Sequence, residues 1–360
     1  MTNPVTRLRR TAAEFQAKDA KDKKRAVVDG VLNNALYILM VLFIIYTSIK
    51  APNFLTMGSF TNLIVQVAAD LPMALGIAGC IVLTGTDLSA GRVMGLSAAV
   101  AGVFLQKIDY AGRMFPGLPA PSWWWILATL AFVAIIGAIV GIVNGYFVAK
   151  FNLHPFIVTL ATQLITFGVI LWFFALNGNN GQPISGLSDE YKTAIGGTMF
   201  RVQNVAVPRY VLYAILLTVL MWVIWNKTSF GKNMFAVGSN AEAAKVSGVN
   251  VFKTTVMVHT LAGIMYAYSG FVEAVRSSSV QATTGQNLEC DAIAACVIGG
   301  VSFVGGTGKI SGILMGVFIL RIIFVALTML SVDSASIYII KGAIILCACA
   351  LDMRKYLVKK

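Results

Sequence analysis

The chain has 360 residues, of which 58% are hydrophobic and only 12% are charged, and its net charge is +13. Soluble domains are about a quarter charged, and a mean hydropathy of +0.79 leaves more apolar surface than a water-facing globule can bury. The composition therefore excludes an ordinary soluble domain and indicates a membrane protein. At about 20 apolar residues per spanning helix, the apolar content is enough for about ten of them.

A polar and basic segment, residues 1–30, precedes the first apolar run. A cleavable signal peptide would have a short basic region followed at once by an apolar one, so this segment does not fit that pattern. We expect a solvated cytoplasmic tail at 1–30 and a second, shorter basic tail at 353–360.

Apolar stretches bounded by Gly, Pro, Asn or charged residues predict the spans in chain order. They cover residues 31–50, 60–83, 89–107, 123–149, 155–176, 209–226, 254–275, 288–306, 310–331 and 336–352. With both termini in the cytoplasm, most of the lysines and arginines outside the spans fall on the cytoplasmic side, as the positive-inside rule expects. The sequence thus predicts an all-α polytopic membrane protein with one ten-helix domain over 31–352. The positive charge is explained by topology, so we expect a lipid bilayer and no nucleic acid as its partner.

Two of these spans carry residue patterns that are typical of membrane helices. Glycines spaced four residues apart across 137–145 allow another helix to approach closely. Trp123–Trp125 open the fourth span, and Trp222 and Trp225 close the sixth, which predicts aromatic belts at the two membrane surfaces. The long segment between the fifth and sixth spans, 177–209, is rich in turn residues and would lie outside, where a partner can dock.

The cytoplasmic segment 227–253 interrupts the apolar pattern for long enough to hold a helix of its own. Ser239 and Glu242 have the spacing of a capping box, so we expect a helix to start there and to end after about two turns at Gly248. Two turns are unstable alone, so this helix either packs into a groove of another protein or rests on the membrane surface. Its candidate contact residues are Gly238, Ser239, Asn240, Glu242, Ala243, Ala244, Lys245, Ser247 and Gly248.

Two polar segments, 85–92 and 284–291, resemble each other. Each follows a span with Thr-Gly, continues with polar residues and leads into an alanine-rich helix. Because five spans separate them, we expect them to face opposite sides, as the inverted halves of a transporter do. A broken helix exposes its backbone only where it lines a pathway, although both segments also suit glycine-rich turns with acidic helix caps.

Polar residues inside the spans are candidates for a solute pathway or for internal pairs. Arg321 is expected to form a buried salt bridge, and the amides suit a neutral polyhydroxylated solute unless they only tie helices together. The candidate pathway residues are Gln66, Asp70, Asp87, Ser89, Asn144, Gln163, Asn287, Glu289 and Asp291.

Sequence motifs for nucleotide binding, metal binding or catalysis are weak in this chain. The run Gly305–Lys309 lacks the first glycine and the final Ser or Thr of a phosphate-binding loop. The two histidines, His154 and His259, and the five cysteines have no metal-ligand spacing. We therefore expect no catalytic, metal or cofactor site in this chain.

Four stretches carry a resemblance to a known family. They are GTDLSAGR at 85–92, FGKNMFAVGSNAEAAKVSGVNV at 230–251, LECDAIAACVIGGVSFVGGTG at 288–308 and YIIKGAIILCACALD at 338–352. They resemble the permease subunits of bacterial monosaccharide ABC importers, the family that includes ribose, arabinose and galactose permeases. The galactose/methyl galactoside branch is the most similar, on Thr86, Ala90, Arg92 and the runs 183–186 and 225–228, whereas 1–30, 123–125 and 280–286 match less well.

The resemblance implies an inverted-repeat permease in the bacterial inner membrane that conducts a monosaccharide and is not itself an enzyme. It further implies a second copy of the chain, an extracytoplasmic sugar-binding protein, and a cytoplasmic ATPase subunit that binds ATP and Mg. The helix at 239–248 would then be the coupling helix, seated in a cleft of the ATPase. We expect a few hydrogen bonds to the sugar and no deep charged pocket.

Three other classes stay open on the sequence. An ion-coupled secondary transporter would use Asp70, Asp87 or Glu273 to carry a proton or sodium ion. A membrane-embedded enzyme would need an acid, base or metal cluster at one membrane face, for which Asp87 and Arg92 alone are too few. A receptor or scaffold would conduct no solute.

Overall fold

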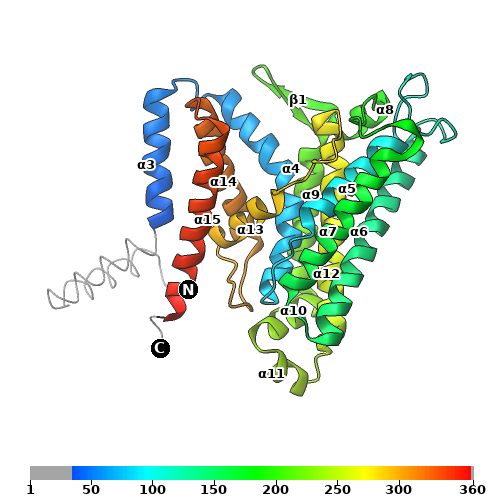
Figure 1. Cartoon of the computed structure of the whole chain (residues 1–360). Coiled ribbons are helices and arrows are strands. Elements are labelled where there is room, and N and C mark those ends of the chain that lie inside the picture. The colour runs from blue at the N-terminus through cyan, green and yellow to red at the C-terminus, as the bar shows by residue number, and fades with distance from the viewer. Residues whose placement is uncertain (1–34, 358–360) are drawn as a thin grey trace.

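The computed structural model describes residues 35–357, so the predicted tail at 1–30 lies outside the described residues. The described chain is almost entirely helical (Figure 1). The long helices are α3 (Ala35–Lys50), α4 (Met57–Val82), α5 (Ala90–Phe104), α6 (Trp123–Phe151), α7 (Pro155–Ala175), α9 (Arg209–Lys227), α12 (Val251–Ser277), α14 (Ile310–Met329) and α15 (Ser334–Leu357). Each predicted span contains a helix, and the protein is an all-α polytopic membrane protein.

The shorter elements lie at the two ends of this bundle (Figure 1). One end, called here the hairpin end, holds the helix α8 (Asp189–Tyr191) and an antiparallel pair of strands, β1 (Thr198–Val202) and β2 (Val205–Pro208). The single turns η1 (Leu176–Gly178) and η2 (Lys192–Gly196) belong to the same connection. The other end, called the α11 end, holds α10 (Ser229–Ser239) and α11 (Ala241–Val246). The turn-rich segment 177–209 is therefore folded, and α15 continues past residue 352 to Leu357.

Six helices, namely α4, α6, α7 with η1, α9, α12 and α14, are long and apolar enough to cross a membrane. The sequence leaves open whether the apolar stretch 288–306 crosses the membrane fully, and the helix that it contains is too short to do so. The helix there, α13 (Leu288–Ile298), has 11 residues and is about 16 Å long at 1.5 Å per residue, whereas a bilayer core is about 30 Å thick. Irregular segments, 278–287 and 299–309, lie on either side of α13.

The helices differ in how much of their surface the protein covers. The apolar stretches of α4 and α12 are 78% and 67% buried, whereas those of α6, α7 and α9 are only 28% buried. Large apolar side chains such as Ile139, Leu164 and Trp172 are exposed on α6 and α7. Because a soluble protein rarely exposes such continuous apolar faces, the faces of α6, α7 and α9 suit contact with lipid or with another membrane subunit, and α4 and α12 form the centre.

Helix starts are set by local capping groups, as the sequence requires. Ser122 accepts a hydrogen bond from the backbone N–H of Trp125 at the start of α6, and Asn250 accepts one from Lys253 at the start of α12. α7 begins with Pro155 at its first position, where a missing N–H costs nothing. These caps fix the ends of long helices that hydropathy alone places only approximately.

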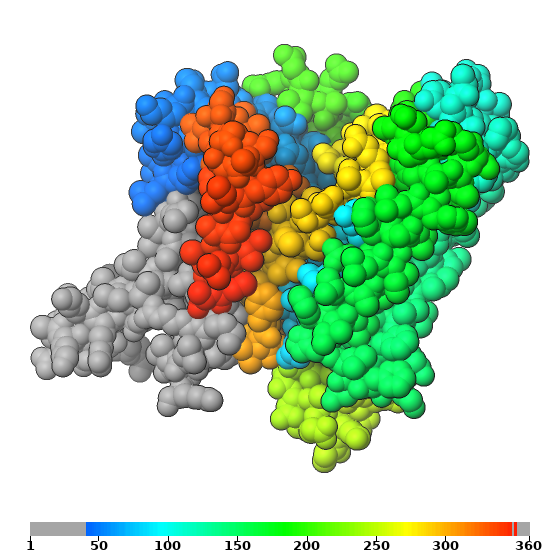
Figure 2. Space-filling model, viewed as in Figure 1, coloured from blue at the N-terminus to red at the C-terminus, as the bar shows by residue number. Residues whose placement is uncertain are grey.

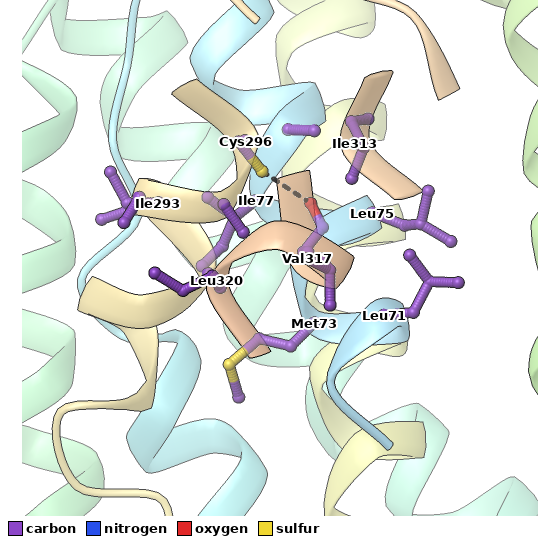
Figure 3. Close-up of a cluster of buried hydrophobic side chains, with 14 of the residues drawn as sticks. Leu71, Met73, Leu75, Ile77, Ile293, Cys296, Ile313, Val317 and Leu320 are labelled. Atoms are coloured by element: carbon purple, nitrogen blue, oxygen red, sulfur yellow. Dashed lines mark hydrogen bonds between the residues drawn. The ribbon is translucent and has the colours of Figure 1, made fainter. Parts of the chain in front are cut away.

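Buried apolar side chains form two clusters that meet along α4 and α12. The first joins α4, α13 and α14, where Cys296 donates to the carbonyl of Ala74 at 3.2 Å and Val317 packs beside them (Figure 3). The second joins α5, α6 and α7 with the connection at the hairpin end. The short helix α13 is thus held by packing on both neighbours.

The glycines of α6 lie against α12 as the spacing predicts. A methyl group on Gly137 would lie 2.2 Å from the carbonyl oxygen of Gly263, and one on Gly141 would lie 2.2 Å from that of His259. Since such distances are too short for any side chain, small residues set the approach of these two backbones. The predicted close packing is confirmed.

The aromatic belts are only partly as predicted. Trp123, Trp124 and Trp222 are exposed at the surface. Trp125 instead donates its indole N–H to the carbonyl of Phe104 at 2.9 Å, and Trp225 is only 3% exposed. These two rings pack inside the bundle because neighbouring helices cover them.

Candidate functional site

The segment between α4 and α5 carries a buried carboxylate at the centre of a polar group. Asp87 Oδ1 accepts hydrogen bonds from the backbone N–H of Ser89 at 2.9 Å and from its hydroxyl at 2.6 Å. Asn144 on α6 donates from Nδ2 to the Ser89 hydroxyl at 3.0 Å. All three side chains are at most 1% exposed. The predicted residues Asp87, Ser89 and Asn144 therefore belong to one hydrogen-bonded group.

Three residues from α4 and α12 complete this group. Tyr266 donates its hydroxyl to Asp87 Oδ2 at 3.3 Å, and His259 Nδ1 lies 3.8 Å from the same oxygen. Cys80 Sγ lies 3.6 Å from His259 Nδ1. None of the three was predicted for the pathway, although His259 and Tyr266 are seven residues apart and so lie on one face of a helix. That spacing was the available signal.

α7 holds the same irregular segment from its other side. The hydroxyl of Thr159 accepts from the backbone N–H of Leu88 at 3.1 Å and donates to the carbonyl of Thr86 at 3.3 Å. A non-helical backbone inside a membrane is stable only where such partners satisfy it. The GTDLSAGR motif is therefore held in place by side chains of α6, α7 and α12.

The second polar segment meets the first inside the bundle. A methyl group on Gly91 would lie 2.2 Å from the carbonyl oxygen of Gly285 and 2.1 Å from Glu289 Oε2, and Gly95 is equally close to the carbonyl of Thr284. Glycines on α5 thus let the backbones of the two polar segments touch inside the bundle. Which side of the membrane each segment faces stays a prediction.

Glu289 lies buried beside this contact, between α13, α5 and α7. Gln163 Nε2 donates to Glu289 Oε1 at 3.4 Å, while Glu289 Oε2 has no hydrogen-bond partner among the described residues. The Arg92 guanidinium lies 4.0 Å from the centre of the Phe167 ring and 3.5 Å from the carbonyl oxygen of Ala282. The predicted residues Gln163 and Glu289 thus share one polar layer with a buried arginine.

Two ion pairs join α4 and α13 to the last two helices. Arg321 on α14 forms a two-pronged pair with Asp70 on α4, which confirms the expected salt bridge. Lys341 on α15 donates to Asp291 at 2.8 Å. A cavity of about 30 Å³ lies between these pairs and is lined by Asp70, Asp291 and Arg321 together with apolar residues and Ser269. Charged side chains therefore line this small cavity, whereas the expectation of no deep charged pocket for the sugar stays a prediction.

Asn287 and Gln66 lie apart from the buried groups. Asn287 is exposed at the start of α13 with a left-handed backbone (φ 64°), next to the exposed Gln286. Figure 2 shows this region, yellow to orange, set back between α15 in red and α7 in green. Gln66 is half-buried, one turn before Asp70 on α4. The start of α13, where Asn287 is exposed, therefore lies in this recessed region of the surface.

The helix predicted at 239–248 exists, but its cap differs from the prediction. α11 begins at Ala241, and Asn240, not Ser239, is its cap, accepting from the N–H of Ala243 at 2.9 Å. Ser239 closes α10 and donates to the carbonyl of Phe235 instead, so no capping box with Glu242 forms. The predicted stop is confirmed, since Gly248 has φ 86° and donates its N–H to the carbonyl of Lys245.

α11 stands out from the α11 end of the bundle (Figure 1). Ala244 is 4% exposed and packs inward, while Ala243, Glu242, Lys245 and Ser247 are exposed. Val246 is 89% exposed, which is unusual for an apolar side chain beside so many polar ones. The outer face of α11 is thus free within the described chain and carries an apolar tip that the sequence reasoning missed.

A close contact at Gly238 links the region of α10 and α11 to the end of α4, just before the segment 83–89. A methyl group on Gly238 would lie 1.9 Å from the carbonyl oxygen of Val82, and the N–H of Gly306 donates to that same oxygen at 2.9 Å. Gly306 also packs on Ser239, at the junction of α10 and α11. The run Gly305–Lys309 therefore serves as a packing turn between the α11 element and the end of α4.

Comparison with known proteins decides the family. Residues 59–349 match the family described as branched-chain amino acid transport system / permease component. The chain belongs to this family. The galactose/methyl galactoside import permease proteins MglC of Haemophilus influenzae and Escherichia coli are each 40% identical to it over 341 residues, which cover 94% of this chain and 99% and 98% of theirs. The ribose import permease protein RbsC of Bacillus subtilis is 35% identical, over 93% of this chain and 97% of its own. No solved structure matches.

The resemblance to sugar permeases that the four motifs carry is thereby confirmed. The family match begins at residue 59, so it includes the helices that hold every buried polar group described above. The functional residues can therefore be interpreted as parts of a transport permease.

Proposed function

We propose that this chain is the permease subunit of an ATP-binding cassette importer and forms the pathway for a monosaccharide, galactose or a methyl galactoside. The observation that carries the proposal is the layer of polar side chains inside an apolar helical bundle, from Asp87 and Asn144 to Glu289 and Asp70. Polar groups at this depth are costly unless they serve a pathway or pair with one another. The 40% identity to galactose/methyl galactoside permeases supports this sugar class over ribose.

The proposed pathway is closed in this conformation. The cavity between the two ion pairs has a volume of about 30 Å³, which is enough for one or two water molecules and not for a hexose. Passage of sugar therefore requires α13 and α14 to move away from α4. This movement would also separate Asp291 on α13 from Asp70 on α4. The recess in front of Asn287 is the place where the sugar would meet the chain first.

The energy for this movement would come from a separate ATPase subunit, which binds ATP and Mg. The outer face of α11, with Ala243 and Val246, suits a cleft of that subunit, and the Gly238 contact would transmit its movement to the segment 83–89. A second copy of the chain and an extracytoplasmic sugar-binding protein complete the proposed inner-membrane assembly. The binding protein would dock at the hairpin end, and both termini would be cytoplasmic.

The test of the function is sugar uptake in proteoliposomes that contain the chain with its copurified partners. We expect uptake of labelled galactose to require ATP, to be competed by methyl galactoside more strongly than by ribose, and to be unaffected by a proton uncoupler. Uptake that follows a proton or sodium gradient without ATP would instead identify an ion-coupled carrier. Ribose as the better competitor would refute the galactose assignment and keep the ATP-driven one.

The test of the coupling element is the variant Ala243→Arg. Because Ala243 is exposed, the arginine leaves the fold intact but fills the face that would enter the cleft. We expect the variant to insert normally and to lose copurification of the ATPase. A matched control is Lys232→Arg, which changes an exposed residue of α10 conservatively. Full recovery of the ATPase with Ala243→Arg would place its docking site elsewhere.

A further inference from the structure

Three side chains that are typical metal ligands converge inside the bundle. Cys80 Sγ, His259 Nδ1 and a carboxylate oxygen of Asp87 all lie within 4.8 Å of one another. The cysteine comes from α4, the histidine from α12 and the carboxylate from the segment between α4 and α5. Each side chain is at most 2% exposed. The fold brings His259 to the two other residues, which lie 179 and 172 positions before it in the sequence.

We propose that Cys80, Asp87 and His259 form a binding site for a thiophilic divalent transition-metal ion such as Zn²⁺. The cysteine sulfur lies 3.6 Å and the Asp87 oxygen 3.8 Å from His259 Nδ1. In a tetrahedral zinc site, with Zn–S near 2.3 Å and Zn–N near 2.0–2.1 Å, bonded ligand atoms lie about 3.5 Å apart. Two of the three ligand distances are thus within a few tenths of an ångström of those in a zinc site, and the third, from Cys80 Sγ to the Asp87 carboxylate, is at most 4.8 Å.

The donor set favours zinc-like ions over calcium or magnesium. A thiolate and an imidazole are soft and borderline ligands that select Zn²⁺, Co²⁺ or Cd²⁺, whereas calcium and magnesium require oxygen ligands. Three protein ligands leave the fourth tetrahedral position to water, as in other three-ligand zinc sites.

Charge balance supports binding at this depth. A divalent ion together with one thiolate and one carboxylate carries no net charge, so the complex avoids the cost of an isolated charge in the membrane interior. The thiol proton leaves on binding, and neutral His259 supplies a lone pair. The hydroxyl of Tyr266 already donates to Asp87 Oδ2 and orients it, as groups around metal ligands do. The ion would enter through the irregular segment, where Thr84 is exposed three residues before Asp87.

A bound ion would tie α4, α12 and the segment 83–89 together. Since α12 follows directly on the α11 element, any rearrangement that moves α12 against α4 would have to break a metal bond. We therefore expect the ion to reduce transport, independently of which sugar is carried.

The experiment uses the full chain, purified in detergent and freed of metal with a chelator, and adds Co²⁺ as a spectroscopic probe. The expected result is one Co²⁺ per chain with an absorption band from sulfur-to-cobalt charge transfer. Cys80→Ser should abolish the band, and His259→Gln should weaken Co²⁺ affinity by at least about tenfold. The matched control is Cys290→Ser, which removes an exposed cysteine and should leave the band unchanged.

A second variant keeps the proposal testable if Cys80→Ser fails to fold. It replaces the two exposed cysteines, Cys290→Ser and Cys347→Ser, and keeps Cys80. Retention of the band in that variant supports the buried site without any change to its ligands. Absence of the band in the unaltered chain, or its loss with Cys290 and Cys347, would overturn the proposal.

Discussion

Gly91 and Gly285 face each other so closely that a methyl group on either one would lie 2.1 to 2.2 Å from the carbonyl oxygen of the other. The two residues are at the start of α5 and in the irregular segment before α13. Their contact is what brings the two polar segments of the chain into one layer. A side chain at either position would push Glu289 and the α13 start away from Asp87 and Ser89.

The variant Gly91→Ala tests this contact. The added methyl group would clash with a backbone carbonyl and with the Glu289 carboxylate, so we expect a loss of about 1–3 kcal/mol in stability from overpacking. Thermal unfolding of the purified chain in detergent measures it. The matched control is Gly168→Ala on α7, where a methyl group meets nothing within 4 Å. There alanine should be neutral or stabilising, because it restricts the unfolded chain more than glycine does. Equal melting temperatures for both variants would contradict the close contact.

The pair Asp70–Arg321 should show strong coupling between its members. Removing one partner from a fully buried ion pair costs about 3–5 kcal/mol, and we expect somewhat less here because the two side chains are 29% and 21% exposed. Asp70→Asn and Arg321→Gln should each destabilise the chain, and the double variant should recover part of the loss. Thermal stabilities of the four proteins give the coupling energy. Strict additivity of the two single effects would mean that the pair contributes nothing.

The cap of α11 can be distinguished from the predicted capping box by three alanine variants. Asn240→Ala removes the acceptor of the Ala243 N–H and should destabilise the helix by about 1 kcal/mol. Ser239→Ala and Glu242→Ala should have little effect on it, since neither side chain caps α11. Hydrogen exchange of the amide at Ala243 reports the difference, with several-fold faster exchange in Asn240→Ala alone. Faster exchange in Ser239→Ala instead would restore the capping box.

The variant Asp87→Asn should reduce sugar uptake more strongly than it reduces assembly of the chain with its partner subunits. Asp87 accepts from Ser89 through one carboxylate oxygen and from Tyr266 through the other. Asparagine has only one acceptor oxygen, so one of these contacts is lost. Hydrogen bonds to a charged group contribute about 1.5–3 kcal/mol each. We expect uptake to fall at least about tenfold at equal expression. Asp109→Asn, at an exposed position of the hairpin end, is the control. Unchanged uptake with Asp87→Asn would remove Asp87 from the pathway.

Hydropathy predicts most of the fold because a membrane span is a local property of the chain. Every predicted span holds a helix, and Gly248 stops α11 as expected. The length of α13 was not predicted, since most of 288–306 is apolar and the helix end at Ile298 is set by packing on α4 and α14. The predicted capping box was wrong because α10 extends through Ser239, which leaves Asn240 as the cap of α11.

The candidate site was predicted only in part for a similar reason. Asp87, Ser89, Asn144, Gln163 and Glu289 are polar residues inside the spans or next to them, and that feature is visible in sequence. The partners Cys80, His259 and Tyr266 belong to the group only through the packing of α12 on α4. Contacts between residues that are almost 180 positions apart leave no local pattern, so the sequence could propose members of the site but not their arrangement.

The short helix α13 also constrains how the protein is made. Eleven residues cannot cross the bilayer alone, and Glu289 and Asp291 near its start oppose entry into lipid. The partner of Asp291 is Lys341 on α15, a helix that leaves the ribosome some fifty residues later. We therefore expect α13 to take its place after α14 and α15 have inserted, and a chain that stops before Lys341 to leave this segment outside the finished bundle.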